Sequence, residues 1–375
     1  MTRTQHRQKY LAALFVFLLS FTVKADEIRI GVVSQLTGAT ATFGQENANG
    51  IMLSHKKLKK VGDHTLKLFV EDDKSEAIES TNATRKLLNV DKVSVMIGAP
   101  TSSLALASAP IVQEAKIPFI TPTATNAKVT QMGSFISRAC FTDDFQGVVM
   151  AKFALNDLKL SKGIILTEIT SDYSQGLSQS FKKEFLKLGG KLVGDGDLTY
   201  SAKDTDFQSI LRKVKRAKAD FIFIPGYYVE VGHILKQARA QGINIPVLGG
   251  DGWDSPVLFE VAGPSATNIY ISNHFASDDS NPRVQEFVKL YETTYKSSPG
   301  SFAALGYDAY GMVVEAIKKA KSTKPEDINQ ALTTLKNYEG ITGTISLDKN
   351  RNPIKSAVIL EGANGKFKFR TRVNP

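Results

Sequence analysis

From residue 28 onward, the apolar positions of the chain alternate between two spacings. Short runs of β-branched and other apolar residues are typical of buried strands, and apolar residues three and four positions apart are typical of helices. In the first half, strand-like runs cover 28–33, 65–70, 93–99 and 117–121, and helical spacing covers 45–60, 75–90 and 104–115. Strand and helix therefore alternate strictly and end on a fourth strand.

A second unit with the same number of elements begins near Gly163. Its strand-like runs are 164–167, 191–198, 221–224 and 246–248, and its helical segments are 175–188, 204–217 and 229–240. The strands are apolar on both faces, which is typical of parallel sheets covered by helices on both sides. We predict an α/β protein with two doubly wound parallel-sheet lobes, and not a barrel, because the order of elements restarts.

The pattern is less regular after about residue 275. Helical spacing covers 282–297, 306–321 and 326–337, and two strand-like runs, 357–361 and 366–370, flank the turn residues 363–365 as in a hairpin. A chain that has completed two lobes must add these elements to one or both of them. We therefore expect it to cross between the lobes more than once.

The first 25 residues form a separate segment. Arg3, Arg7 and Lys9 precede an apolar run from Leu11 to Val23, with Ala25 at its end. A basic start, a short apolar run and small residues before a cleavage site are typical of a secretory signal peptide, and the run is shorter than the roughly 20 residues of a membrane span. We predict a signal peptide at 1–25, a mature chain starting at Asp26 and a periplasmic location; an uncleaved anchor is the alternative.

Composition and charge exclude several classes of partner. The 375 residues are 42% apolar and carry a net charge of +10. Removal of 1–25 leaves 43 basic and 37 acidic residues, a net charge of +6. The lysines at 56–60 and the basic residues at 366–372 have the spacing of solvated faces, so we expect no nucleic-acid or membrane partner. Cys140, the single cysteine, is expected in the core.

Two loops of the first unit carry candidate binding residues. In open parallel sheets, ligands bind outside the carboxyl ends of the strands, where helix N-termini present free N–H groups. Ser102 lies in the loop and helix start at 98–106, and Thr123, Ala124 and Thr125 lie in the loop at 121–126. Their hydroxyl and backbone groups suit a carboxylate, although a plain helix cap explains the first loop equally well.

The equivalent loops of the second unit carry different chemistry. Tyr173 lies in 170–176, Tyr227 in 225–232, and Asp251 between glycines in 249–255. An acidic group beside aromatic rings suits an ammonium and an apolar body. Taken singly, Asp251 could equally be a turn residue and the tyrosines could equally be packing residues.

Catalytic and nucleotide-binding motifs are missing from the sequence. It contains no GxxxxGK[ST], HExxH or GxSxG pattern, and the histidines of the mature chain are scattered. We therefore expect no enzyme activity, no metal site and no cofactor.

The chain resembles the periplasmic solute-binding proteins of branched-chain amino-acid ABC transporters, the leucine/isoleucine/valine-binding type. The resemblance runs through IRIGVVSQLTGATATFGQENANG (28–50), PGYYVEVGHILKQAR (225–239), GGDGWDSP (249–256) and GYDAY (306–310). It implies a type I binding fold with three hinge crossings, near Thr142–Phe145, His274–Ser277 and Ile345–Asp348. The corresponding lobes are 26–144 plus 276–345 and 145–275 plus 346–375.

The resemblance also implies roles for the loop residues. Ser102 and Thr125 resemble the donors to the ligand carboxylate, the Thr123 carbonyl would face the ammonium, and Tyr173 and Tyr227 resemble the covering rings. Two further positions depart from the family. Asp251 stands where leucine-binding members have a glutamate, and Phe43 stands where transport members have a tryptophan against the ligand side chain.

Together, these implications describe a protein that binds its ligand when the two lobes close on it. An amino acid, branched-chain or similar, would bind between the lobes, and an inner-membrane ABC permease would recognise the closed monomer. Two other functions stay open. A ligand-sensing protein in signalling could use the same fold, and an enzyme would require a nucleophile or metal that the sequence does not display.

Overall fold

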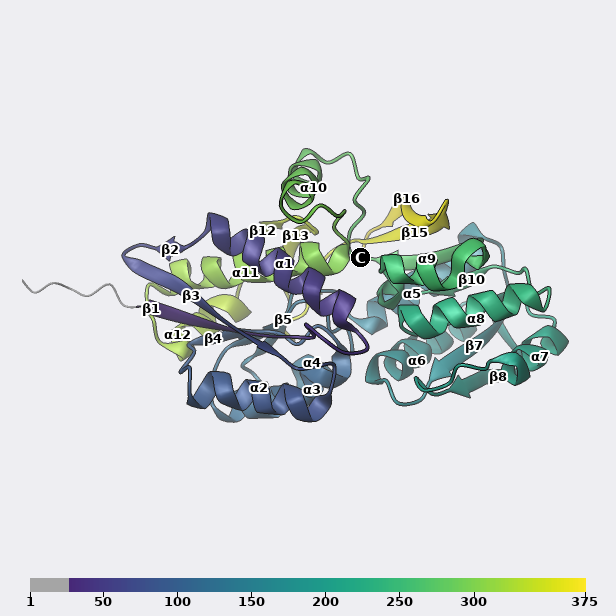
Figure 1. The fold of residues 1–375 in the computed structure, drawn as a ribbon, viewed down its shortest axis with the longest axis horizontal. Coiled ribbons are helices and arrows are strands. Elements are labelled where there is room, and N and C mark those ends of the chain that lie inside the picture. Colours follow the sequence, from purple (N-terminus) through teal and green to yellow (C-terminus); the bar gives the residue numbers. More distant parts are fainter. Residues whose placement is uncertain (1–26) are drawn as a thin grey trace, which may run out of the picture.

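The computed structural model describes residues 27–375, so the predicted signal peptide at 1–25 lies outside the described residues. Two lobes lie side by side, each with a central sheet and helices on both of its faces (Figure 1). Within the described range, every helix is too short or too polar to span a membrane. The predicted fold class is confirmed.

The first lobe is built on five parallel strands. They lie in the order β3 (His64–Asp72), β1 (Glu27–Ser34), β4 (Val95–Ile97), β5 (Phe119–Thr121) and β6 (Ile136–Arg138), and the short β2 (Lys60–Val61) pairs antiparallel with β3. Successive residues of β1 pack into different cores. Ile30 and Val32 join the core formed with α11 (Ser301–Ala320) and α12 (Pro325–Thr333). Val33 joins the core formed with α2 (Ala77–Asn89) and α3 (Ser102–Glu114).

Helix α1 (Ala41–Lys57) crosses α11 on one face of this lobe (Figure 1). The crossing is close, because a Cβ atom added at Gly50 would lie 1.9 Å from the carbonyl oxygen of Ala303. Helix α10 (Pro282–Tyr295) packs beside these helices, and the short helix α4 (Lys128–Gln131) precedes β6.

The second lobe repeats this plan and extends it. Its parallel strands lie in the order β11 (Ile269–Asn273), β10 (Val247–Gly249), β9 (Phe221–Phe223), β7 (Lys162–Glu168) and β8 (Lys191–Tyr200). The hairpin of β15 (Ala357–Ala363) and β16 (Lys366–Val373) continues the sheet antiparallel from β11, in agreement with the predicted hairpin.

Helices cover both faces of the second sheet as well. Helix α5 (Asp143–Lys152), the π-helical turn η1 (Phe153–Asp157) and α6 (Asp172–Lys187) share one core with it. Helices α7 (Gln208–Ala217), α8 (Tyr228–Ala240) and α9 (Pro256–Ala262) share the other. Two 3₁₀ turns, η2 (Asp251–Trp253) and η3 (Gly263–Ser265), flank α9. Cys140 is buried and unpaired, as predicted.

Several elements, including β2, α4 and α9, differ from the sequence predictions. The fifth strands β6 and β11 and the helix α5 were not predicted. Strand β6 contains one apolar residue and so forms no apolar run, and α5 is apolar on several sides because α6 and β11 cover it. Helix α11 begins at Ser301 instead of residue 306, since its first turn is buried.

The chain passes between the two sheets three times. The passages lie between β6 and β7, after β11, and before β15. A third sheet, β12 (Tyr338–Gly340), β13 (Gly343–Leu347) and β14 (Pro353–Ile354), precedes the last passage, and Ile345 and Leu347 pack with α11. We therefore propose that the third crossing follows Ile354, later than the expected 345–348, and that the first lobe extends to this point.

Candidate functional site

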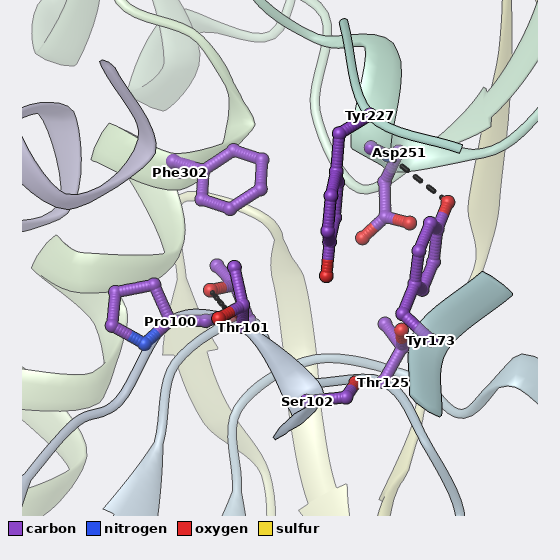
Figure 2. A pocket seen from close by; sticks show the side chains of 10 residues that line it. Pro100, Thr101, Ser102, Thr125, Tyr173, Tyr227, Asp251 and Phe302 are labelled. Atoms are coloured by element: carbon purple, nitrogen blue, oxygen red, sulfur yellow. Dashed lines mark hydrogen bonds between the residues drawn. The ribbon is translucent and has the colours of Figure 1, made fainter. Parts of the chain in front are cut away.

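A small pocket lies between the lobes, where the loops after β4 and β5 face the loops after β7, β9 and β10. Nearly all of its ten lining residues are buried. The first lobe lines it with Pro100, Thr101, Ser102, Thr123, Thr125 and Phe302, and the second lobe with Tyr173, Tyr227, Asp251 and Gly252 (Figure 2).

The first lobe presents hydrogen-bond donors to the pocket. Ser102 is the first residue of α3, and the side chain of the preceding Thr101 does not cap the helix, because it accepts a bond of 2.6 Å from Gln35 Nε2 instead. The Ser102 Oγ accepts the backbone N–H of Asn126 at 3.2 Å, which leaves its hydroxyl hydrogen free to donate. An uncapped helix N-terminus with an adjacent hydroxyl favours an anion.

A buried arginine holds the loop that carries Thr123 and Thr125. Arg138, at the end of β6, donates to the carbonyl oxygens of Ala124 at 2.7 Å and Asn126 at 2.8 Å. The Thr123 hydroxyl donates to the Pro100 carbonyl at 2.6 Å and so joins the two loops. The loop therefore keeps one shape, and a positive charge lies beneath it.

The second lobe presents one carboxylate and two stacked rings. The Tyr173 and Tyr227 rings are nearly parallel, with an angle of 10° and centroids 5.3 Å apart, and the Asp251 carboxylate lies beside them (Figure 2). Burial raises the pKa of both tyrosines well above the usual value, so both hydroxyls stay protonated. The Tyr173 hydroxyl accepts the Gly252 N–H at 3.1 Å, which fixes the ring against η2.

Glycine on each side of Asp251 allows this close packing. A Cβ atom at Gly250 would lie 2.6 Å from the Tyr173 hydroxyl, and one at Gly252 would lie 2.7 Å from the Gly226 carbonyl oxygen. Larger residues would push η2 away from the ring. The GDG sequence therefore determines how far Asp251 reaches into the pocket.

Buried polar residues surround the Asp251 carboxylate. Gln146 Nε2 donates to Oδ1 at 3.1 Å, and His274 Nε2 lies 3.2 Å from Oδ2. Burial lowers the pKa of His274 to about 4, so the imidazole is neutral at pH 7. Burial also raises the pKa of the neighbouring Asp143 well above its usual value, and the charge of Asp251 adds to this.

Six of the eight predicted binding residues meet in this pocket: Ser102, Thr123, Thr125, Tyr173, Tyr227 and Asp251. The other two do not line it. Ala124 packs in the core between α2, α3 and the sheet, because Arg138 draws its carbonyl inward. Phe43 lies one layer behind the wall and stacks on Phe302, with centroids 3.9 Å apart and an angle of 4°.

Pro100, Thr101 and Gly252 line the pocket from loops that the sequence indicated, whereas Phe302 lies outside every predicted loop. It lies in the first turn of α11, more than 50 residues after Asp251, and does not follow a strand. Its place in the pocket could therefore not be predicted from the loops that follow strands. The extra turn at the start of α11 places its ring opposite Tyr227 (Figure 2).

The two lobes contact each other around the pocket. Asn126 Nδ2 donates to the Asp172 carbonyl at 2.6 Å, the Asp172 N–H donates to Ser103 Oγ at 3.1 Å, and the Tyr228 hydroxyl donates to the Ala39 carbonyl at 3.1 Å. These bonds join residues of different lobes. The structure is therefore a form in which the two lobes are in contact around the pocket.

The two walls of the pocket carry groups suited to opposite charges. Donors from the first lobe face a carboxylate from the second, and aromatic rings cover the space between them. Among residues 27–375, no group of three or more His, Cys, Asp and Glu side chains is placed to hold a metal ion. The site is suited to holding a small dipolar molecule.

Comparisons with known proteins agree with this architecture. The model of the family described as periplasmic binding protein matches residues 27–366. The crystal structure of the leucine-binding protein LivK from Thermotoga maritima is 36% identical, with a TM-score of 0.89 over 93% of this chain and 99% of that one. LivJ from Streptococcus pneumoniae, a branched-chain amino acid transporter substrate-binding protein solved with isoleucine, is 31% identical, with a TM-score of 0.87 over 93% and 100%.

A third similar structure holds a different ligand. It is an ABC transporter solute-binding protein from R. palustris in complex with benzoate, 26% identical, with a TM-score of 0.84 over 93% of this chain and 97% of that chain. The fold therefore accommodates both amino acids and aromatic acids, and the residues of the pocket must distinguish them.

Proposed function

The chain belongs to the periplasmic binding protein family, and we propose that it captures an α-amino acid of the branched-chain type and delivers it to an ABC permease. The observation that carries this proposal is the pairing of Ser102 and the α3 N-terminus with Asp251 across one pocket. A zwitterion satisfies both walls at once. Proteins of this family are solute receptors and not enzymes.

The Asp251 carboxylate would make the pocket select an amino acid over an aromatic acid. Asp251 is 3% exposed, and the ten lining residues contain no lysine, arginine or histidine. A benzoate would bring a second negative charge next to Asp251 without an ammonium to offset it, and buried like charges repel strongly. An amino acid adds one charge of each sign.

The apolar part of the ligand would lie between Tyr227 and Phe302. Phe43 and Tyr228 support these rings from behind, with the Phe43 centroid 5.7 Å from Tyr227 and 4.8 Å from Tyr228. These aromatic rings suit an apolar side chain such as that of valine, leucine or isoleucine. These residues would make the size selection, and Asp251 the charge selection.

We further propose the location and partners that the sequence indicates. Cleavage of 1–25 would release the chain into the periplasm, where it would act as a monomer. An inner-membrane permease would then recognise the joined surfaces of the closed lobes. Transport is favoured over signalling because the similar structures named above include transporter components.

A calorimetric screen of the mature chain against amino acids and aromatic acids tests the proposal. We expect leucine, isoleucine or valine to bind, and benzoate and 4-hydroxybenzoate to bind at least tenfold more weakly. Ligand at about 100 times its dissociation constant should add about 2.7 kcal/mol to the free energy of unfolding. Tight binding of a benzoate with no response to amino acids would refute the proposal.

A further inference from the structure

The Gln146 side chain forms hydrogen bonds with both the backbone and the side chain of Asp251. Its Nε2 donates to Asp251 Oδ1 at 3.1 Å, and its Oε1 accepts the Asp251 N–H at 3.0 Å. The Ser272 hydroxyl donates to the same Oε1 at 2.8 Å. Since Oε1 receives two donors, the orientation of the amide is fixed, and its N–H groups must face the carboxylates.

His274 holds the other carboxylate oxygen. Its Nε2 lies 3.2 Å from Asp251 Oδ2, and because an ionised carboxylate only accepts hydrogen bonds, Nε2 carries the hydrogen. The imidazole ring stacks on Phe141, with centroids 3.6 Å apart. Gln146 and His274 are 0% and 2% exposed, so solvent does not replace them.

Neither residue lines the pocket, yet together they occupy one site on each oxygen of its only charged side chain. The two carboxylate oxygens have about four acceptor sites, so acceptors remain for an ammonium. A free aspartate would rotate about its side-chain bonds and lose conformational entropy on binding. Here the orientation is set before the ligand arrives.

Both residues also lie at crossings between the lobes. Gln146 is in the first turn of α5, directly after the passage from β6, and Ser272 and His274 lie at the end of β11, where the chain leaves the second sheet. The Asp251 carboxylate is thus hydrogen-bonded to residues at two of the three crossings.

We propose that Gln146 and His274 are positioning residues that orient the Asp251 carboxylate for an α-ammonium group and connect it to the hinge. This inference rests on the proposed function. It makes the selection for an amino group depend on two residues that never touch the ligand. A purely structural role would instead weaken the binding of every ligand alike.

The test compares L-leucine with 4-methylpentanoate, which has the same carbon skeleton and carboxylate but no amino group. The Q146M substitution keeps a side chain of similar volume and removes the hydrogen bonds of the Gln146 amide. We expect its leucine affinity to fall about tenfold or more, the loss typical of a charge-assisted hydrogen bond, and its 4-methylpentanoate affinity to change less than about threefold. Calorimetry measures both, and competition extends the range for the weaker ligand.

The matched control is Q237M in the same lobe. Gln237 also accepts one backbone N–H, from Phe207 at 2.8 Å, and donates to one carbonyl, that of Thr205 at 2.8 Å, but far from the pocket. It should lose stability without a change in either affinity. H274F retains the ring stacked on Phe141 and removes the donor to Oδ2, so it repeats the test independently if Q146M does not fold.

The outcomes test the proposed function and the positioning role separately. If the wild type does not prefer leucine over 4-methylpentanoate, the proposed function fails, and the positioning role fails with it. If the wild type prefers leucine and Q146M and H274F keep that preference unchanged, the function stands and the positioning role is overturned. An equal loss for both ligands also overturns it.

Discussion

Asp254 forms a contact between the lobes that is predicted to control closure without touching the ligand. It follows η2 in the second lobe, and its Oδ2 accepts the backbone N–H of Ser301, the first residue of α11 in the first lobe, at 2.7 Å. The preceding Gly300 has no side chain with which to cap the helix. The opposite lobe therefore supplies one of the acceptors at the start of α11, beside the Glu46 carboxyl of the first lobe.

The expected size of this contact follows from its chemistry. A hydrogen bond to a charged acceptor contributes about 1.5–3 kcal/mol, and a negative charge at a helix N-terminus is favourable. Part of this is offset by Glu46 of α1: burial raises its pKa well above the usual value, and the nearby charge of Asp254 raises it further. We expect D254A to weaken the closed form by about 1–2 kcal/mol, which is roughly 5–30-fold in affinity.

Calorimetry with L-leucine measures the change in affinity, and small-angle scattering of the ligand-free protein measures the distribution of open and closed forms. D254N retains an acceptor but not the charge, so its loss should be smaller than that of D254A. The control is D220A, because Asp220 accepts the N–H groups of Ser161 and Lys162 within one lobe. Wild-type affinity in D254A would refute the assignment of this bond to closure.

Three further predictions concern the site and the stability of the fold. S102A should lower leucine affinity about tenfold, since it removes one donor at the α3 N-terminus, and it should also lower the unfolding temperature of the ligand-free protein, because the buried Asn126 N–H loses its acceptor. G50A should lower the free energy of urea unfolding by about 1–3 kcal/mol or more, because its Cβ would overlap the Ala303 carbonyl. Burial raises the pKa of Asp73 from 3.8 to about 7, so the folded state binds its proton more tightly, and stability should fall as pH rises between these values. D73N should reduce this slope in urea unfolding at pH 5 and pH 8, and an unchanged slope would contradict the assignment.

The alternation of strand and helix could be predicted because it depends on local spacing. Strand β1 is buried on both faces, and a short apolar run such as IRIGVV is typical of such a strand. The first four strands of each lobe and the helices between them follow this rule. Strand β6 does not, because it contains one apolar residue, followed by a serine and a buried arginine, and so forms no apolar run.

The lining residues could be predicted where they follow a parallel strand. Ser102, Thr125, Tyr173, Tyr227 and Asp251 all lie directly after one, and parallel strands bring their carboxyl ends to one edge of a sheet. Ala124 was grouped with its neighbours by position alone. The structure turns its backbone toward Arg138 instead, so it lies in the core.

What the sequence determined by itself was the set of elements and the chemistry at the strand ends, because both follow from the order of residues along a short segment. What only the tertiary structure decided was which distant segments share the pocket. Phe302 reaches the wall because the chain returns to the first lobe through α11, and His274 and Gln146 meet at Asp251 because two crossings lie side by side. Contacts of this kind depend on how segments far apart in the sequence pack against one another, and no local pattern encodes that geometry.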